Sequence, residues 1–332
     1  MKHLLSRMIF RSIAFVLLLA IHASAASLSP APRATGPKPR PAGPEIIALP
    51  DGRRMAVHHF GDPNGAPVLF FHGWPSDASM GLLLDSAARK NHLRVIAPDR
   101  PVIGHSDPQP RRTLSDWPAD VRALTAHYGI RKFAVLGASG GSPYALATVS
   151  AMPGKVTVAA VVSGVPPLDD PRDADVLPAH YRNMLQSHNS HPATLRAAFR
   201  VGRPIISHLI PDAFIHLALL RLPAPDRATL ADSRNFSIII GGMRRSWASC
   251  SDGVHDDAVI YTRPWGFPLS QIRTRVDIWH GAADANFPPE LARKFAARIP
   301  GARLHIVPAE GHYSLPVNHA DLILATLARS AR

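Results

Sequence analysis

From residue 45 onward, short apolar runs alternate with longer stretches of helical periodicity. Such alternation is typical of a parallel sheet whose strands are joined by helices that cover both faces. The first two runs, 45–49 and 55–60, flank the turn tripeptide Pro50-Asp51-Gly52, which predicts an antiparallel pair. We therefore expect an α/β fold with a mostly parallel eight-stranded sheet flanked by helices. The six further strands are expected at 67–72, 93–98, 132–138, 156–163, 275–281 and 302–308, and helices at 113–128, 290–298 and 315–327.

The alternation stops between residues 171 and 272, where prolines punctuate a run of helical stretches. This pattern predicts a helical cap inserted into a core formed by 45–170 and 273–332. An insertion between two strands of one sheet is expected to cover the strand ends, where open α/β sheets bind ligands.

The N-terminal residues have the order of a secretory signal. Lys2, Arg7 and Arg11 precede an apolar run at 12–21, and Ala23-Ser24-Ala25 follows as a small-x-small cleavage site. The apolar run is too short for a hydrocarbon layer that needs about twenty residues. We expect residues 1–25 to be a signal peptide cleaved near Ala25/Ala26, which predicts a secreted or periplasmic protein without stable membrane insertion of the mature chain. Residues 26–44 are interpreted as a Pro-rich linker.

The composition, 46% hydrophobic and 18% charged residues, is that of a soluble globular protein. The formal net charge of +13 comes mainly from arginine, in scattered pairs such as Arg53-Arg54 and Arg244-Arg245. No nucleic-acid-binding motif accompanies them, so we expect a solvated surface and no nucleic-acid partner. Cys250 is the single cysteine and excludes an internal disulfide. The oligomeric state is left open.

A G-x-S-x-G pattern, Gly137-Ala138-Ser139-Gly140-Gly141, stands between the apolar run 133–136 and a helix-like stretch at 143–152. A sharp strand-to-helix turn would lift a serine hydroxyl clear of the sheet, where a base and a substrate can reach it. Ser139 is therefore the predicted nucleophile. The five-residue pattern is modest evidence by itself, and the prediction depends on partners elsewhere in the chain.

Candidates for those partners follow other strands. His312, in Gly311-His312-Tyr313 after the last strand, is the predicted base, because imidazole can take and return a proton near neutral pH. Asp284 follows the strand that ends at Gly281 and is predicted to orient the imidazole. The backbone amides of Gly140 and Trp74 are the expected oxyanion donors.

Together these segments make the chain resemble the α/β-hydrolase fold superfamily, in its serine-nucleophile, esterase- or lipase-like branch with a helical cap. The resemblance covers about 45–329 outside the insertion, and Val102 departs from it, because the family usually has glycine there. It implies Ser139 as nucleophile, Asp284 as acid and His312 as base, with Trp74 and Gly140 at the oxyanion hole. The matching segments are His72-Gly73-Trp74-Pro75, Asp99-Arg100-Pro101 with Gly104-His105-Ser106, the serine turn, His280-Gly281 with Asp284 and Pro288, and Gly311-His312.

Several alternatives remain for individual residues. Ser106 lies in a near-match of the serine pattern, and Asp169 or Asp170 would be a second position for the acid. His72 and His280 are interpreted as buried structural residues. Two further groups, His188 with His191 and His255 with Asp256 and Asp257, have no complete ligand set, so neither metal nor another cofactor is expected.

These residues predict an exported serine hydrolase that cleaves small to medium carboxylic esters through an acyl-enzyme, with a small-molecule ester as substrate. The cap is expected to line the pocket with Phe199, Phe214 and Trp247. An aminopeptidase, a carbon–carbon bond hydrolase, a perhydrolase-like enzyme and a non-catalytic ligand receptor remain as alternatives on the same fold. Prolyl aminopeptidases of this fold carry a His-Gly-Gly-Pro-Gly loop, in which Trp74 would replace the second glycine.

Overall fold

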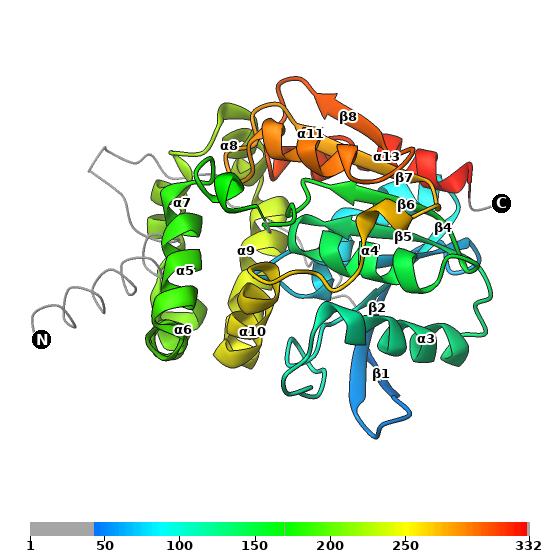
Figure 1. The fold of residues 1–332 in the computed structure, drawn as a ribbon, viewed down its shortest axis with the longest axis horizontal. Helices are drawn as coiled ribbons and strands as arrows, with labels where there is room; N and C mark the ends of the chain where they lie inside the picture. The colour runs from blue at the N-terminus through cyan, green and yellow to red at the C-terminus, as the bar shows by residue number, and fades with distance from the viewer. Residues whose placement is uncertain (1–42, 169, 331–332) are drawn as a thin grey trace, which may run out of the picture.

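The computed structural model describes residues 43–168 and 170–330 (Figure 1). The predicted signal peptide at 1–25 and nearly all of the linker at 26–44 lie outside the described residues. Among the described residues, no helix combines the length and the apolar character that a membrane crossing requires.

The core of the molecule is an eight-stranded sheet in the order β1-β2-β4-β3-β5-β6-β7-β8. β1 and β2 pair antiparallel, as do β2 and β4, and the other neighbours are parallel. The prediction of a mostly parallel α/β sheet that opens with an antiparallel pair is confirmed, with every strand boundary within one residue of the expected position. The strands are β1 (Glu45–Ala48), β2 (Arg54–Gly61), β3 (Ala66–Phe71), β4 (Leu93–Pro98), β5 (Phe133–Ala138), β6 (Val156–Val162), β7 (Val276–Gly281) and β8 (Arg303–Val307).

Helices cover both faces of this sheet, as the alternation of side chains along each strand requires. In β3, Leu69 and Phe71 pack on one face, and Val68 and Phe70 pack on the other. The first face is covered by α3 (Trp117–His127), α4 (Ser142–Ala151) and α11 (Pro289–Ala297), and the second by α2 (Asp85–Lys90) and α13 (Ala320–Ala328). Shorter elements are η1 (Ala78–Leu83), η2 (Leu114–Asp116), η3 (Ser139–Gly141) and α12 (Ser314–Asn318).

Between β6 and β7 the chain forms helical elements, and we call residues 171–272 the cap. Figure 1 shows α5, α6, α7, α9 and α10 stacked beside one end of the sheet. They enclose a hydrophobic cluster of their own that includes Leu195, Phe199 and Trp247. The cap elements are η4 (Pro171–Ala174), α5 (Ala179–Ser190), α6 (Pro192–Pro204), η5 (Ile205–Leu209), α7 (Asp212–Leu219), α8 (Ala224–Ala231), α9 (Ser233–Ser249), α10 (Ser251–Tyr261) and η6 (Leu269–Gln271).

Candidate active site

Ser139 occupies a strained turn between β5 and α4. Its φ of 48° lies in the left-handed region, which side chains other than glycine rarely adopt and which persists only where the packing enforces it. The packing here depends on two flanking glycines. A Cβ on Gly141 would lie 1.9 Å from the Phe71 carbonyl oxygen, and one on Gly137 would lie 2.7 Å from the Gly141 carbonyl oxygen. These close approaches hold the turn and present the Ser139 hydroxyl at the end of β5.

The structure brings the predicted base and acid to this hydroxyl. His312 Nε2 lies 3.0 Å from Ser139 Oγ, and His312 Nδ1 lies 2.9 Å from Asp284 Oδ2. An ionised carboxylate can only accept, so in the neutral imidazole the proton is on Nδ1 and Nε2 is left to accept from the serine. The other carboxylate oxygen, Asp284 Oδ1, accepts from the amides of Asn286 and Phe287 at 2.8 and 2.9 Å. Both carboxylate oxygens of Asp284 are therefore held by hydrogen bonds.

Burial and the neighbouring charges have opposite effects on the pKa values of Asp284 and His312. Burial raises the pKa of Asp284, but His312, His280 and the amide of Phe287 together outweigh that effect, and the pKa is lower than usual. For His312, burial lowers the pKa, whereas the negative charge of Asp284 and the hydrogen bond to it raise the pKa above its ordinary value. The arrangement therefore keeps the acid ionised and makes the imidazole a stronger base than a free histidine.

The two expected oxyanion residues lie next to each other beside this serine. A Cβ on Gly140 would lie 2.7 Å from Trp74 Cβ, and one on Gly73 would lie 3.5 Å from Ser139 Cβ. Buried Arg100 donates a hydrogen bond of 2.9 Å to the carbonyl of Gly73. Because a peptide unit is planar, this bond also orients the N–H of Trp74. The assignment of these amides as oxyanion donors stays a prediction.

Behind that loop lies a buried charge cluster that sequence reasoning did not find. The carboxylate of Asp257 in α10 accepts from Arg100 Nε and from the Tyr144 hydroxyl, each at 2.7 Å, and from Arg112. Burial raises the pKa of Asp257, but the two guanidinium groups lower it to about 2. Asp257 is thus an arginine partner rather than a metal ligand. No local pattern marks it, because Arg100 and Arg112 are far away in sequence.

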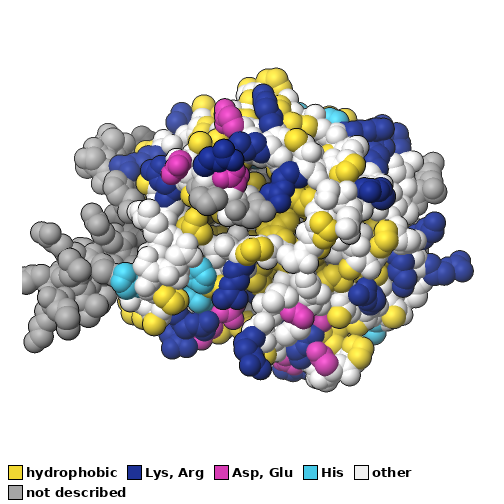
Figure 2. All heavy atoms as spheres, in the orientation of Figure 1, with side chains coloured by type: hydrophobic (Ala, Val, Ile, Leu, Met, Phe, Trp, Pro, Cys, Tyr) yellow, Lys and Arg dark blue, Asp and Glu magenta, His cyan; other side chains and the backbone are white. Residues whose placement is uncertain are grey.

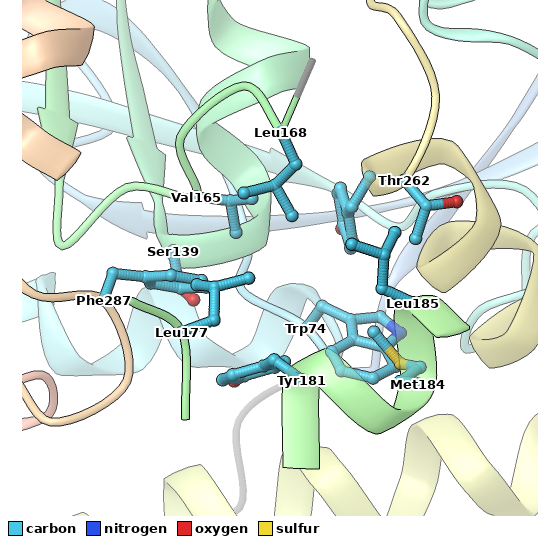
Figure 3. A pocket seen from close by; sticks show the side chains of 11 residues that line it. Trp74, Ser139, Val165, Leu168, Leu177, Tyr181, Met184, Leu185, Thr262 and Phe287 are labelled. Atoms are coloured by element: carbon cyan, nitrogen blue, oxygen red, sulfur yellow. The ribbon is translucent and has the colours of Figure 1, made fainter. Parts of the chain in front are cut away.

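A cavity opens at Ser139 between the sheet and the cap (Figure 3). It has about 450 Å³ of space between atoms, part of it open to solvent. In Figure 2, hydrophobic side chains gather in the hollow between the cap and the sheet. The cavity is lined by Trp74, Ser139, Val165, Leu168, Leu177, Tyr181, Met184, Leu185, Tyr261, Thr262 and Phe287.

None of the three predicted cap residues, Phe199, Phe214 and Trp247, is among those lining residues. The rings of Phe199 and Trp247 stack inside the cap core with their centroids 5.1 Å apart, because the apolar faces of α6 and α9 pack against each other. Phe214 on α7 is 54% exposed. The lining from the cap comes instead from α5, where Tyr181, Met184 and Leu185 recur at helical spacing, together with Leu177 before α5 and Tyr261 and Thr262 at the end of α10. That spacing is the sequence signal that would have identified the α5 residues.

The alternative residues have other partners. Ser106 Oγ donates to the Asp99 carbonyl and accepts from the Ala56 amide. Asp170 pairs with Arg172 at 2.7 Å, and Asp169 lies outside the described residues. His72 and His280 are buried, and their rings contact the carbonyls of Gly73 and Phe287 at 3.0 and 2.8 Å. These contacts agree with structural roles for both histidines.

Val102 occupies a backbone conformation that favours glycine. Its φ is 71°, in the left-handed region. A β-branched side chain is uncommon there. Its Cβ lies only 2.8 Å from where a Cβ on Gly253 of α10 would be. The departure is therefore accommodated by a glycine on the facing cap helix.

Comparison with known proteins identifies the same fold. Residues 66–318 match the family model described as alpha/beta hydrolase fold. The chain is 36% identical over 124 residues to a non-heme chloroperoxidase of Streptomyces lividans, a match that covers 37% of this chain and 45% of that protein. It is 29% identical over 119 residues to a proline iminopeptidase of Xylella fastidiosa, covering 34% and 36% of the two chains. These matches span less than half the length of either relative.

A solved structure is similar over a longer range. An esterase from Exiguobacterium antarcticum superposes with a TM-score of 0.59 at 18% identity, covering 86% of this chain and 98% of the other. At that identity, the likeness shows the fold alone.

Proposed function

Because the chain belongs to the α/β-hydrolase fold family, we propose that it is an exported serine hydrolase that cleaves small to medium carboxylic esters through an acyl-enzyme. The observation that carries this proposal is the continuous hydrogen-bonded row from Asp284 through His312 to Ser139. The same three residue types in this order form the nucleophilic machinery of serine hydrolases.

In the proposed reaction, His312 Nε2 takes the proton from Ser139 as the hydroxyl oxygen attacks the ester carbonyl. The negative charge that develops on the carbonyl oxygen is stabilised by the amides of Trp74 and Gly140. His312 then gives its proton to the leaving alcohol. A water molecule, deprotonated by His312, then attacks the acyl carbon, and His312 returns this proton to Ser139 Oγ as the carboxylic acid leaves. Asp284 stabilises the imidazolium in both half-reactions.

The character of the cavity supports an uncharged acyl group. No Asp, Glu, Lys or Arg is among the described residues that line it. An aminopeptidase has to bind the charged amine of its substrate, and a buried ammonium without a partner costs several kcal/mol. The cavity therefore favours a neutral ester over an aminoacyl amide, although an iminopeptidase is among the related proteins.

The test is a panel of p-nitrophenyl esters of increasing acyl length, compared with p-nitroanilides of amino acids carrying the same leaving-group ring. We expect kcat/KM for the best ester to exceed that for the best aminoacyl anilide by about 100-fold or more, because the anilide has the less reactive bond and also brings an unpaired ammonium into the cavity. Faster hydrolysis of the anilides would contradict the ester assignment. Tight binding without turnover of either class would favour a receptor.

The α5 lining is expected to set acyl length. Leu185→Ala should move the preferred ester toward longer chains and Leu185→Trp toward shorter ones, since each methylene in an apolar pocket changes discrimination by about 1–3 kcal/mol. The measurement is kcat/KM across the ester series. Leu209→Ala is the matched control, because Leu209 belongs to the cap but is 67% exposed and outside the cavity lining. An unchanged profile in both Leu185 variants would place the acyl chain elsewhere.

Export is a separate part of the proposal and is supported by the order of basic, apolar and small residues at 1–25. Protein recovered outside the cytoplasm of its native host is expected to begin near Ala26. N-terminal sequencing of that protein makes the test, and an intact Met1 would count against cleavage.

A further inference from the structure

The cap contributes a buried carboxylate to the loop that carries His312. Asp226, in the first turn of α8, is 1% exposed. Its oxygens accept hydrogen bonds from three consecutive backbone amides, those of His312, Tyr313 and Ser314, at 3.0, 2.9 and 2.8 Å. The hydrogen bonds found for this carboxylate in the described residues thus go to the backbone of the histidine loop rather than to another cap residue.

The contact between cap and loop is too close for a side chain at residue 311. A Cβ on Gly311 would lie 2.4 Å from Asp226 Oδ2. The amide of Gly311 donates to Ser314 Oγ at 2.8 Å, which closes the loop on itself. Residues 311–314 are therefore folded around the carboxylate, and glycine is required where the two meet.

The imidazole of His312 is consequently held from two directions. Its ring is bonded to Asp284 of the sheet domain, whereas its backbone is bonded to Asp226 of the cap. Small displacements of a catalytic group are costly, and about 1 Å can lower a rate by about 100-fold. With both contacts in place, His312 Nε2 lies 3.0 Å from Ser139 Oγ.

We infer that Asp226 is a positioning residue for His312, through which the cap holds the base in its working orientation. This inference rests on the proposed function, in which His312 is the base. The cap then has a role in the reaction itself, besides forming one wall of the cavity.

The charge of Asp226 acts in the same direction as that of Asp284. Burial lowers the pKa of His312, Asp284 raises it, and Asp226 adds to the increase. Among the residues that the structure describes, His280 in β7 and Tyr313 are further titratable groups near this ring, and Tyr181 of α5 interacts with Asp284 and Tyr313. Removal of the Asp226 charge leaves Asp284 as the main group that favours the imidazolium, so the pKa of His312 should fall.

The test is the Asp226→Asn variant, which keeps the size of the side chain and removes its charge. We expect kcat for the best ester to fall about 10–100-fold with KM changed much less, because the ground-state pocket is untouched. The acid limb of the kcat/KM profile should move to lower pH, since the imidazolium is less stable without Asp226. Asp232→Asn is the matched control, because Asp232 is also a cap carboxylate but bonds to an amide of its own helix, that of Asn235. It should leave kcat and the pH profile unchanged.

A second variant covers the case in which Asp226→Asn does not fold. Gly311→Ala retains the carboxylate but pushes it from the loop, and it should give the same fall in kcat and the same shift of the acid limb. If Ser139→Ala is inactive but the folded Asp226 and Gly311 variants keep wild-type kcat and pH profile, this inference is wrong and the proposed function stands. If Ser139→Ala remains active, the proposed function itself fails.

Discussion

Replacing Ser139 with alanine is expected to lower kcat/KM for the best ester by about 10⁴-fold or more and to leave the protein folded. The hydroxyl is the atom that attacks in the proposed reaction, and members of such a triad act as a unit, so losing one removes most of the rate. Alanine is smaller than serine, so the substitution should not disturb the close packing at Gly137 and Gly141. Steady-state kinetics with the ester panel, with circular dichroism to confirm folding, make the measurement.

The control is Ser106→Ala, at the near-match of the serine pattern. Its hydroxyl links the Asp99 carbonyl to the Ala56 amide, so this variant should lose some stability but keep kcat within a few-fold of the wild type. A fluorophosphonate probe followed by peptide mapping should mark Ser139 alone. Labelling of Ser106, or an active Ser139→Ala protein, would remove Ser139 from the nucleophile position.

Asp257→Asn is expected to lower the free energy of unfolding by about 3–5 kcal/mol, as breaking a buried ion pair does. The substitution keeps the shape of the side chain but leaves the guanidinium groups of Arg100 and Arg112 uncompensated, with side chains that are 1% and 3% exposed. Urea unfolding at pH 7 makes the measurement. Because Arg100 also bonds to the Gly73 carbonyl, the variant should lose activity as well.

Asp256→Asn is the matched control for that variant, since the adjacent carboxylate pairs with Arg196, which is 41% exposed. An exposed pair of this kind contributes about 1 kcal/mol or less to the free energy of unfolding.

The pKa of Asp257 is below its unfolded value, so the contribution of Asp257 to stability is complete above about pH 4 and is lost as the pH falls toward 2. Equal unfolding free energies for the two variants would show that the buried cluster does not stabilise the fold.

The strands and the hydrogen-bonded row of Ser139, His312 and Asp284 could be predicted because each depends on a local pattern. An apolar run between turn residues marks a buried strand without any knowledge of its neighbours. Ser139 and His312 are 173 residues apart, yet each follows a strand of one parallel sheet, and the carboxyl ends of those strands meet at one edge. Strand order then brings together residues that sequence distance separates.

The pocket lining and the buried carboxylates depend on contacts that no local pattern records. Phe199 and Trp247 are large and apolar, but whether such residues face a cavity or a helical neighbour is decided by how the cap helices pack. Asp226 accepts hydrogen bonds from backbone amides, which every residue except proline possesses. The contact therefore cannot be predicted from the residue types of its partners. The sequence around Asp257 indicates at most a possible metal ligand, because the arginines that surround it come from another part of the chain.

The residue that can stand at position 253 depends on the residue at position 102. The left-handed backbone at residue 102 favours glycine, and glycine inside α10 costs about 1 kcal/mol relative to alanine. Glycine is needed at 253 because the Val102 side chain fills the space that a Cβ there would occupy. Because the nearest atom is the Cβ of Val102, only glycine at residue 102 would remove this close contact and open position 253 to a side chain. The order of substitutions, and not only their identity, is thus constrained where the cap meets the sheet domain.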